Sequence, residues 1–234
     1  MPGTIVNAGA IIVGALLGNL LRGGFSERYR SVIMQGISLV VILLGFSMAL
    51  KTENILVLIL SIVSGGILGE LLRIEERLSA LGEKLEKRFG GAGGNRSGLF
   101  ARGFVTASLV FCVGAMAIMG ALESGLTGEH TTLYIKSMID GVAATVFAST
   151  MGIGVAFSAL TVFLYQGVIT LAASYVKPFL TEAIIAEMTA AGGLLISGIG
   201  LNLLVDKLHI RVGNLLPAIF MAIFFVLLLG KFSF

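Results

Sequence analysis

The chain contains several apolar runs of about 20 residues, and these runs constrain its fold more than any other feature. A helix rises about 1.5 Å per residue, so each run is long enough to cross a hydrocarbon core of roughly 30 Å. Of the 234 residues, 56 % are hydrophobic, 12 % are charged and 32 are glycine, a composition that a water-soluble core does not accommodate. Because the bilayer core offers no water to backbone polar groups, the runs predict an all-α, polytopic transmembrane helix bundle.

The apolar runs predict about eight membrane spans within one integral membrane domain, residues 1–234. The spans are expected at about residues 4–22, 32–50, 54–72, 100–122, 133–151, 154–176, 184–204 and 213–231.

Basic residues predict the orientation of these spans. Cytoplasmic loops carry an excess of Lys and Arg, and three loops of this chain hold most of its 16 basic residues. With eight spans and the N-terminus outside, all three loops lie on the cytoplasmic side. Without the span at 133–151, which is the weakest, Lys207 and Arg211 would move outside, against this rule. A re-entrant element with a further half-helix gives the same parity and stays an alternative.

Residues 74–89 predict an amphipathic helix lying along the inner membrane surface. Its apolar positions form one stripe with charged residues opposite, at Ile74, Leu78, Leu81, Leu85 and Phe89. A helix that binds a partner protein is the alternative. Residues 90–98, GGAGGNRSG, then predict a flexible linker, because they lack the preceding strand and the Gly-Lys-Ser/Thr ending of a phosphate-binding loop.

One helical pattern occurs three times, as GALLGNLLR (14–22), GGILGELLR (65–73) and AGGLLISGIGLNLL (191–204). Small residues spaced by four let membrane helices approach closely, so tight helix packing is predicted at Gly14, Gly18, Gly65 and Gly69. In the eight-span topology the three copies run in the same direction and are parallel internal repeats. Such small-residue faces also predict a homodimer.

A polar residue recurs near the inner end of each copy, at Asn19, Glu70 and Asn202. These residues predict a polar layer near the cytoplasmic side. Capping of helix carbonyls or contact with lipid headgroups is the alternative.

The span at 133–151 carries the deepest charged residues of the chain. Lys136 and Asp140 lie four residues apart on one helical face, with Ser137 beside them. A charge at the bilayer centre costs roughly 2.5–3.5 kcal/mol on insertion scales, so such residues predict function. We expect Asp140 to bind a substrate or coupling ion and Lys136 to set its charge state. A self-neutralising pair that only orients the helix is the alternative.

Other polar residues extend this predicted site. Glycines 141, 152 and 154 allow the helix to break, and the neutral oxygen ligands are expected from Thr145, Ser149 and Thr150. Gln166 and Thr170 are further candidates in the next span. Glu123 and Glu187 are expected at the outer entrance, and ordinary surface charges are the alternative for both.

The sequence gives no sign of an enzyme or of a cofactor. The single Cys112 lies in an apolar run, and His130 and His209 are predicted on opposite sides of the membrane. No motif joins a nucleophile to a base, and whether the protein binds a metal stays undecided. The net charge of +3 reflects basic residues that flank apolar runs, so nucleic acid is not an expected partner.

Three stretches carry a family resemblance: Phe104 to Leu126, Lys136 to Leu160 and Phe163 to Leu171. They resemble the bacterial domain-of-unknown-function family 554, also called YdfK/YqgA-like, and the resemblance extends over the whole chain. It implies an integral protein of the bacterial inner membrane. It supplies no substrate.

These features predict a secondary transporter of a small solute or cation, with the lipid bilayer and the solute as partners. An ion channel is the nearest alternative. A membrane scaffold or sensor that uses helix 74–89 is a further one, and it predicts loss of function on deleting that helix but not on Asp140→Asn.

Overall fold

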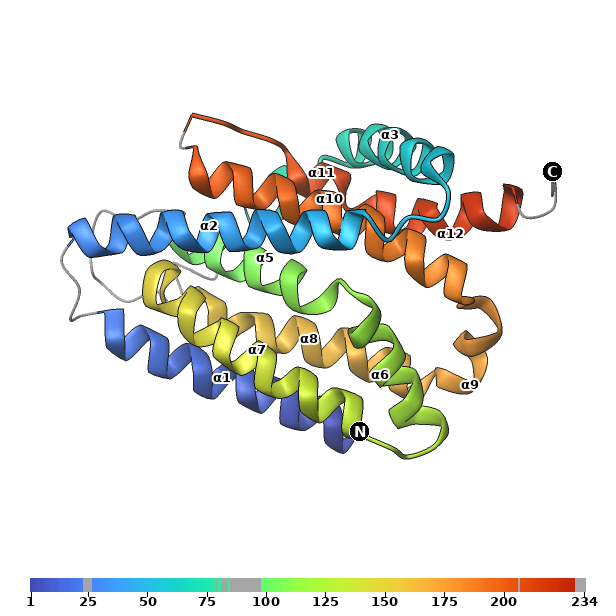
Figure 1. The fold of residues 1–234 in the computed structure, drawn as a ribbon, viewed down its shortest axis with the longest axis horizontal. Coiled ribbons are helices and arrows are strands. Elements are labelled where there is room, and N and C mark those ends of the chain that lie inside the picture. Colours follow the sequence, from blue (N-terminus) through green and yellow to red (C-terminus); the bar gives the residue numbers. More distant parts are fainter. Residues whose placement is uncertain (23–26, 79, 81–83, 85–97, 206, 230–234) are drawn as a thin grey trace. The chain divides into compact units, whose positions relative to one another are not determined.

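The protein is described by a computed structural model that covers residues 1–22, 27–78, 80, 84, 98–205 and 207–229 (Figure 1). These residues form helices and turns, and no strand is present among them. The all-α prediction is therefore confirmed for the described part of the chain.

The helices agree with the predicted apolar runs to within a few residues. They are α1 (Pro2–Arg22), α2 (Glu27–Ala49), α3 (Ile55–Leu72), α5 (Leu99–Cys112), α6 (Ala115–Leu126), α7 (Thr131–Met151), α8 (Gly154–Leu171), α9 (Ala173–Val176), α10 (Glu182–Leu204), α11 (Val212–Leu215) and α12 (Pro217–Leu229). A short 3₁₀ turn, Lys177–Phe179, precedes α10.

A helix break is present, and it lies in a different run from the one whose glycines allow a break. The run at 100–122 is not one helix: α5 and α6 are separated at Val113 and Gly114 and are bent by 62°. Gly114 has φ 134°, a backbone conformation that glycine adopts without the steric penalty of a Cβ atom. The run at 133–151 is the continuous helix α7, and Gly152, with φ 83°, follows its end.

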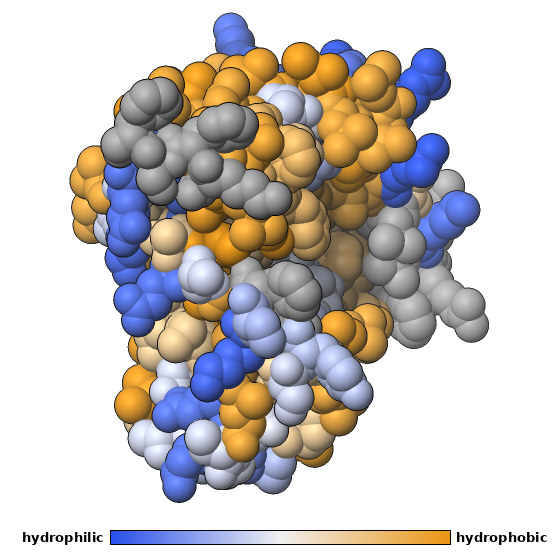
Figure 2. Space-filling view, turned by 90° about the vertical axis from the view of Figure 1, so that its right-hand side faces the viewer, coloured by the Kyte–Doolittle hydropathy of each residue, from blue (hydrophilic) through white to orange (hydrophobic). Residues whose placement is uncertain are grey.

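Six of the described helices are long and apolar enough to cross a membrane, and the bent pair α5–α6 is a seventh candidate. Large apolar side chains are exposed on these helices, as at Leu20 (76 %), Leu43 (70 %) and Leu71 (76 %). Figure 2 shows one face on which hydrophobic residues cover wide areas. Water-soluble monomers rarely expose such patches, so these surfaces suit contact with lipid.

α7 is less apolar than these helices, although its 21 residues make it long enough to cross a membrane. The reason is its polar residues, which lower its mean hydropathy. Lys136 and Asp140 are buried, whereas Ile135, Met138 and Val142 are exposed.

The described chain divides into two compact units. Unit 1 comprises residues 1–37, 79–112 and 116–178, and unit 2 comprises residues 38–78, 113–115 and 179–234. Each unit is assembled from segments far apart in the sequence. The single integral domain remains a prediction.

In unit 1, α1 packs closely along α7 (Figure 1). Gly3 lies against Leu133, Gly14 against the carbonyl of Gly141, and Gly18 against that of Thr145. Residue numbers increase together along the two helices, so α1 and α7 are parallel. A Cβ atom at Gly14 or Gly18 would overlap a backbone carbonyl oxygen of α7.

In unit 2, the second copy of the pattern packs on the C-terminal helices. Gly65 lies against Ala218, and Gly69 against the backbone of Asn214. These glycine faces are filled by contacts inside each unit. The homodimer therefore remains a prediction, and these glycine faces do not supply its interface.

The predicted amphipathic helix is described only in part. Residues 74–78 are helical and follow Arg73, which ends α3 in a left-handed conformation with φ 50°. Ile74 and Leu78 are half-buried, whereas Glu76 and Arg77 are exposed. Most of segment 79–89, and residues 90–97 of the linker, lie outside the described residues.

We expect Gly14→Ala to destabilise the protein, because the added methyl group overlaps the Gly141 carbonyl and forces α1 away from α7. Overpacking of this kind typically costs about 1–3 kcal/mol. Thermal unfolding of the purified protein measures the effect. Gly9→Ala is the matched control, because a Cβ atom at Gly9 meets nothing within 4 Å. Equal melting temperatures for the two variants would contradict the close contact.

Candidate functional site

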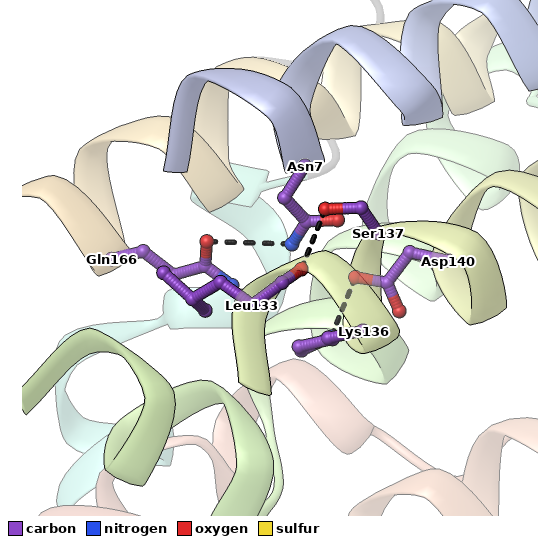
Figure 3. Close-up of polar contacts among 6 residues, drawn as sticks. All are labelled: Asn7, Leu133, Lys136, Ser137, Asp140 and Gln166. Carbon is purple, nitrogen blue, oxygen red and sulfur yellow. Dashed lines mark hydrogen bonds and ion pairs between the residues drawn. The ribbon is translucent and has the colours of Figure 1, made fainter. Parts of the chain in front are cut away.

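The candidate site is built around an ion pair on α7. Lys136 Nζ lies 2.5 Å from Asp140 Oδ2, and the two residues are only 7 % and 4 % exposed (Figure 3). They are one helical turn apart, so the helix itself sets their contact. Asp140 lies near the middle of the 21-residue helix. A carboxylate and an ammonium group are therefore held together deep inside unit 1.

One amide side chain, Asn7, reaches this pair from another helix, and a second, Gln166, is bonded to Asn7. Asn7 of α1 donates from Nδ2 to Gln166 Oε1 of α8 at 3.3 Å, and both residues are 0 % exposed. Asn7 also lies close enough to the Asp140 carboxylate to interact with it. Figure 3 shows Asn7, Gln166 and Ser137 converging on one region. Three helices thus meet at one polar site.

Four polar atoms in this region lack a hydrogen-bond partner within the described protein. They are Thr4 Oγ1, Asn7 Oδ1, Gln166 Nε2 and Thr170 Oγ1. All four side chains are buried, and none is more than 5 % exposed. A buried polar atom left unpaired typically costs about 1–3 kcal/mol, so native proteins pair such atoms or reserve them for a ligand or water.

The hydroxyl groups predicted as neutral ligands have partners in their own helix. Ser137 donates to Leu133 O at 2.6 Å, and Thr145 donates to Gly141 O at 2.9 Å. Ser149 and Thr150 likewise donate to Val146 O and Phe147 O. Their protons are used, whereas the oxygen lone pairs stay available to a ligand. Their roles as ligands remain predictions.

Glu123 lies at the end of unit 1 where α7 begins. Its Oε2 atom accepts a hydrogen bond from Thr132 Oγ1 at 2.6 Å, and the neighbouring Ser124 Oγ lies 2.8 Å from His130 Nδ1. Gly3, at the start of α1, lies beside His130. The beginnings of α1 and α7 therefore share one polar end with Glu123.

Glu187 belongs to unit 2 and has a different environment. It is 2 % exposed and accepts hydrogen bonds from Thr52 Oγ1 at 2.8 Å, Glu53 N at 2.7 Å and Asn54 N at 2.8 Å. These contacts hold the turn that leads into α3. Glu187 is thus fully engaged in the fold of unit 2.

Two residues of the predicted inner polar layer also organise unit 2. Glu70 pairs with Arg211 at 2.7 Å and accepts from Asn214 Nδ2 at 2.6 Å, and its side chain is 58 % exposed. Asn202 bonds both backbone groups of Ile210. Both side chains hold the connection between α10 and α11. Asn19 is half-buried on α1 of unit 1.

Asn7, like Thr4, is a site residue that the sequence analysis did not identify. A signal for it exists in the sequence. Asn7 precedes Gly14 by seven residues and Gly18 by eleven, so the three share one helical face. The face that brings the glycines against α7 also points Asn7 toward it.

No group of three or more His, Cys, Asp or Glu side chains that could hold a metal ion is present in the part of the chain that the structure describes. Cys112 is free and buried.

We expect Glu187→Ala to destabilise the protein by about 1–3 kcal/mol, because the Thr52 hydroxyl and two backbone N–H groups lose their acceptor. Glu187→Gln retains one acceptor oxygen and should lose less. Glu53→Ala is the control, because it removes an exposed side chain and leaves the backbone N–H in place. Thermal unfolding of the three variants checks this order, and an unchanged stability of Glu187→Ala would remove the structural role.

Comparison with known proteins is consistent with an integral membrane protein. The family model described as "Protein of unknown function (DUF554)" matches residues 2–227. The "Uncharacterized membrane protein YdfK" of Bacillus subtilis (strain 168) is 34 % identical over 223 residues, which cover 94 % of this chain and 93 % of that protein. The "Uncharacterized protein YqgA" of Escherichia coli (strain K12) is 28 % identical over 221 residues, 94 % of each chain. No solved structure matches. The family match over nearly the whole chain, together with these two relatives, shows that the protein belongs to the DUF554 family.

Proposed function

We propose that the protein is a secondary transporter that carries a small polar solute or ion across the bacterial inner membrane. The polar site of unit 1 is its binding site. Asp140 binds the solute or coupling ion, Lys136 balances its charge, and Asn7 and Gln166 line the approach to them with neutral polar groups. The observation that carries the proposal is the buried Lys136–Asp140 pair beside buried polar atoms without partners.

A purely structural role accounts less well for this arrangement. Replacing a buried ion pair by apolar residues of similar size is often neutral or stabilising, so such a pair usually adds little to the stability of the folded protein. The surrounding unpaired atoms add a further cost. Helix α1 already packs on α7 through Gly14 and Gly18, which need no polar contact. The polar groups are therefore better explained by a ligand.

The parallel packing of α1 and α7 supports the placement of this site inside the membrane. If both helices cross in the same direction, an odd number of crossings must separate them. α2, α3 and the bent pair α5–α6 supply three. α8, α10 and α11–α12 then complete eight spans with the N-terminus outside. In this topology Asp140 lies near the midplane, where many transporters bind their ions.

The exposed face of α7 agrees with this crossing. Its outward residues are apolar and recur every three or four positions, at Ile135, Met138, Ile139, Val142 and Val146. Lipid can cover this face, while the polar face is turned into the protein, as charged residues in membrane helices require.

The ligand can be identified by thermal unfolding of the purified protein with a panel of metal ions, amino acids, polyamines and organic acids, at two pH values. A ligand at about 100 times its Kd stabilises the native state by roughly 2.7 kcal/mol. We expect at least one compound to raise the melting temperature, and Asp140→Asn to abolish that shift.

Each variant is compared with its own ligand-free state, because Asp140→Asn leaves the Lys136 charge unpaired. Ser158→Ala is the control: Ser158 is buried on α8 and donates within its own helix, to Val155 O. A shift that persists in Asp140→Asn would remove Asp140 from the site. If no compound shifts the wild type, the scaffold alternative becomes the one to pursue.

Flux in proteoliposomes separates a carrier from a channel. For a carrier, unlabelled solute loaded inside should accelerate uptake of labelled solute by exchange, and uptake should saturate. Asp140→Asn should lose this exchange while Ser158→Ala retains it. Uptake that is unsaturable and insensitive to internal solute would identify a channel.

A further inference from the structure

Four of the site's side chains form two short rows on neighbouring helices. Thr4 and Asn7 lie three residues apart on α1, and Gln166 and Thr170 lie four residues apart on α8. Such spacings place each pair on one helical face. The rows meet where Asn7 donates to Gln166. All four side chains are buried, and each carries a polar atom that has no hydrogen-bond partner among the described residues.

The rows begin at one end of unit 1. Thr4 lies in the first turn of α1, and Thr170 lies in the last turn of α8. Gly3 packs beside His130 and Leu133, and Gly125 packs against the Thr170 carbonyl. The same end therefore carries the polar contacts of Glu123 and His130 described above. In the topology proposed here, this end faces outward.

The rows end at the ion pair. Asn7 lies close to the Asp140 carboxylate, one turn deeper than Thr4. Lys136 lies one turn beyond Thr132, which binds Glu123. Polar groups thus continue from the end of unit 1 to its buried charges.

The chemistry of the four unpaired atoms indicates their ligand. Asn7 Oδ1 accepts, Gln166 Nε2 donates, and the two threonine hydroxyls do both. A cation would be repelled by the Gln166 N–H group, and an anion would be repelled by the Asn7 carbonyl. Water both donates and accepts, and a buried water typically makes about three hydrogen bonds.

We infer that Thr4, Asn7, Gln166 and Thr170 bind a file of water molecules that connects the end of unit 1 to Lys136 and Asp140. This file is the aqueous entry to the site, and that role rests on the proposed function. It supplies the partners that the four atoms lack in the protein.

Radiolytic hydroxyl-radical labelling tests this inference, because radicals form from water already in place and no reagent has to enter. Cys112→Ala first removes the only cysteine. Cysteine is then introduced by Gln166→Cys or Thr170→Cys, and its oxidation is measured by mass spectrometry in detergent micelles. Oxidation follows the exposure of the thiol to the aqueous oxidant.

The matched controls are Leu164→Cys and Val168→Cys. These residues flank Gln166 on the same helix but are exposed on its outer face, where detergent covers them. We expect Gln166→Cys and Thr170→Cys to be oxidised at least about tenfold faster than both controls. Rates no higher than the controls would overturn the inference. Fast oxidation at Thr170→Cys alone would also overturn it, because the file would then end before the ion pair.

A second variant tests whether the hydroxyl group holds the water. Thr170→Val keeps the shape of the side chain and removes its hydrogen bonds. Added to Gln166→Cys, it should lower the oxidation of that cysteine several-fold, whereas Ser158→Ala should not. Melting temperatures establish that each variant is folded. If Gln166→Cys or Thr170→Cys melts early, Thr4→Cys on α1 takes its place as the labelled position.

The labelling and the ligand panel fail independently. Strong labelling without any ligand shift would leave the water file standing and remove the transporter proposal. A ligand shift that depends on Asp140, with no labelling above the controls, would support the transporter proposal and remove the water file.

Discussion

The close parallel contact between α1 and α7 is the interaction on which unit 1 depends. Gly14 and Gly18 have no side chains, so backbone meets backbone along half of α1. This approach brings Asn7 within reach of Asp140 and, through α8, of Gln166. In a membrane, where apolar helices gain little by leaving lipid, such van der Waals contact supplies much of the packing energy. The polar site therefore forms because the glycine contact holds α1 and α7 at the distance at which their polar side chains meet.

The two units use buried polar groups in different ways. In unit 2 the carboxylates and amides sit at helix ends, where Glu187 binds the turn before α3 and Asn202 binds Ile210. Glu75 similarly accepts from the backbone N–H of Gly213 at 2.6 Å. Each of these groups has a partner that explains it. In unit 1, Asn7 Oδ1, Gln166 Nε2 and the hydroxyls of Thr4 and Thr170 have no partner among the described residues, and in unit 2 the Thr189 hydroxyl is a further case. Unit 1 therefore holds the larger group of buried polar atoms without a partner among the described residues, and these are the atoms for which we propose a ligand or water.

Much of the fold follows from the sequence because long apolar runs in a membrane have one backbone solution, the helix. The positions of α7 and α8, and the turn between them, were predictable in this way. The α5–α6 break was not, since Gly114 is one of 32 glycines and nothing local distinguishes it from Gly141, which α7 absorbs without bending. The contacts of Glu187 with the turn before α3 were not predictable either, because they join residues more than 130 positions apart, and its role at the outer entrance stays a prediction. Asn7 required knowledge of which helix faces α1.

The Lys136–Asp140 pair has a consequence for the electrical behaviour of the protein. Moving one elementary charge through a membrane potential of 100 mV involves about 2.3 kcal/mol. Because the two opposite charges lie one turn apart on a single helix, they move together when α7 moves, and their contributions to the work cancel. A conformational step that carries α7 across part of the field is therefore nearly silent electrically. Under the proposed function, any current that the protein generates then reports the net charge of the solute and of any coupled ion.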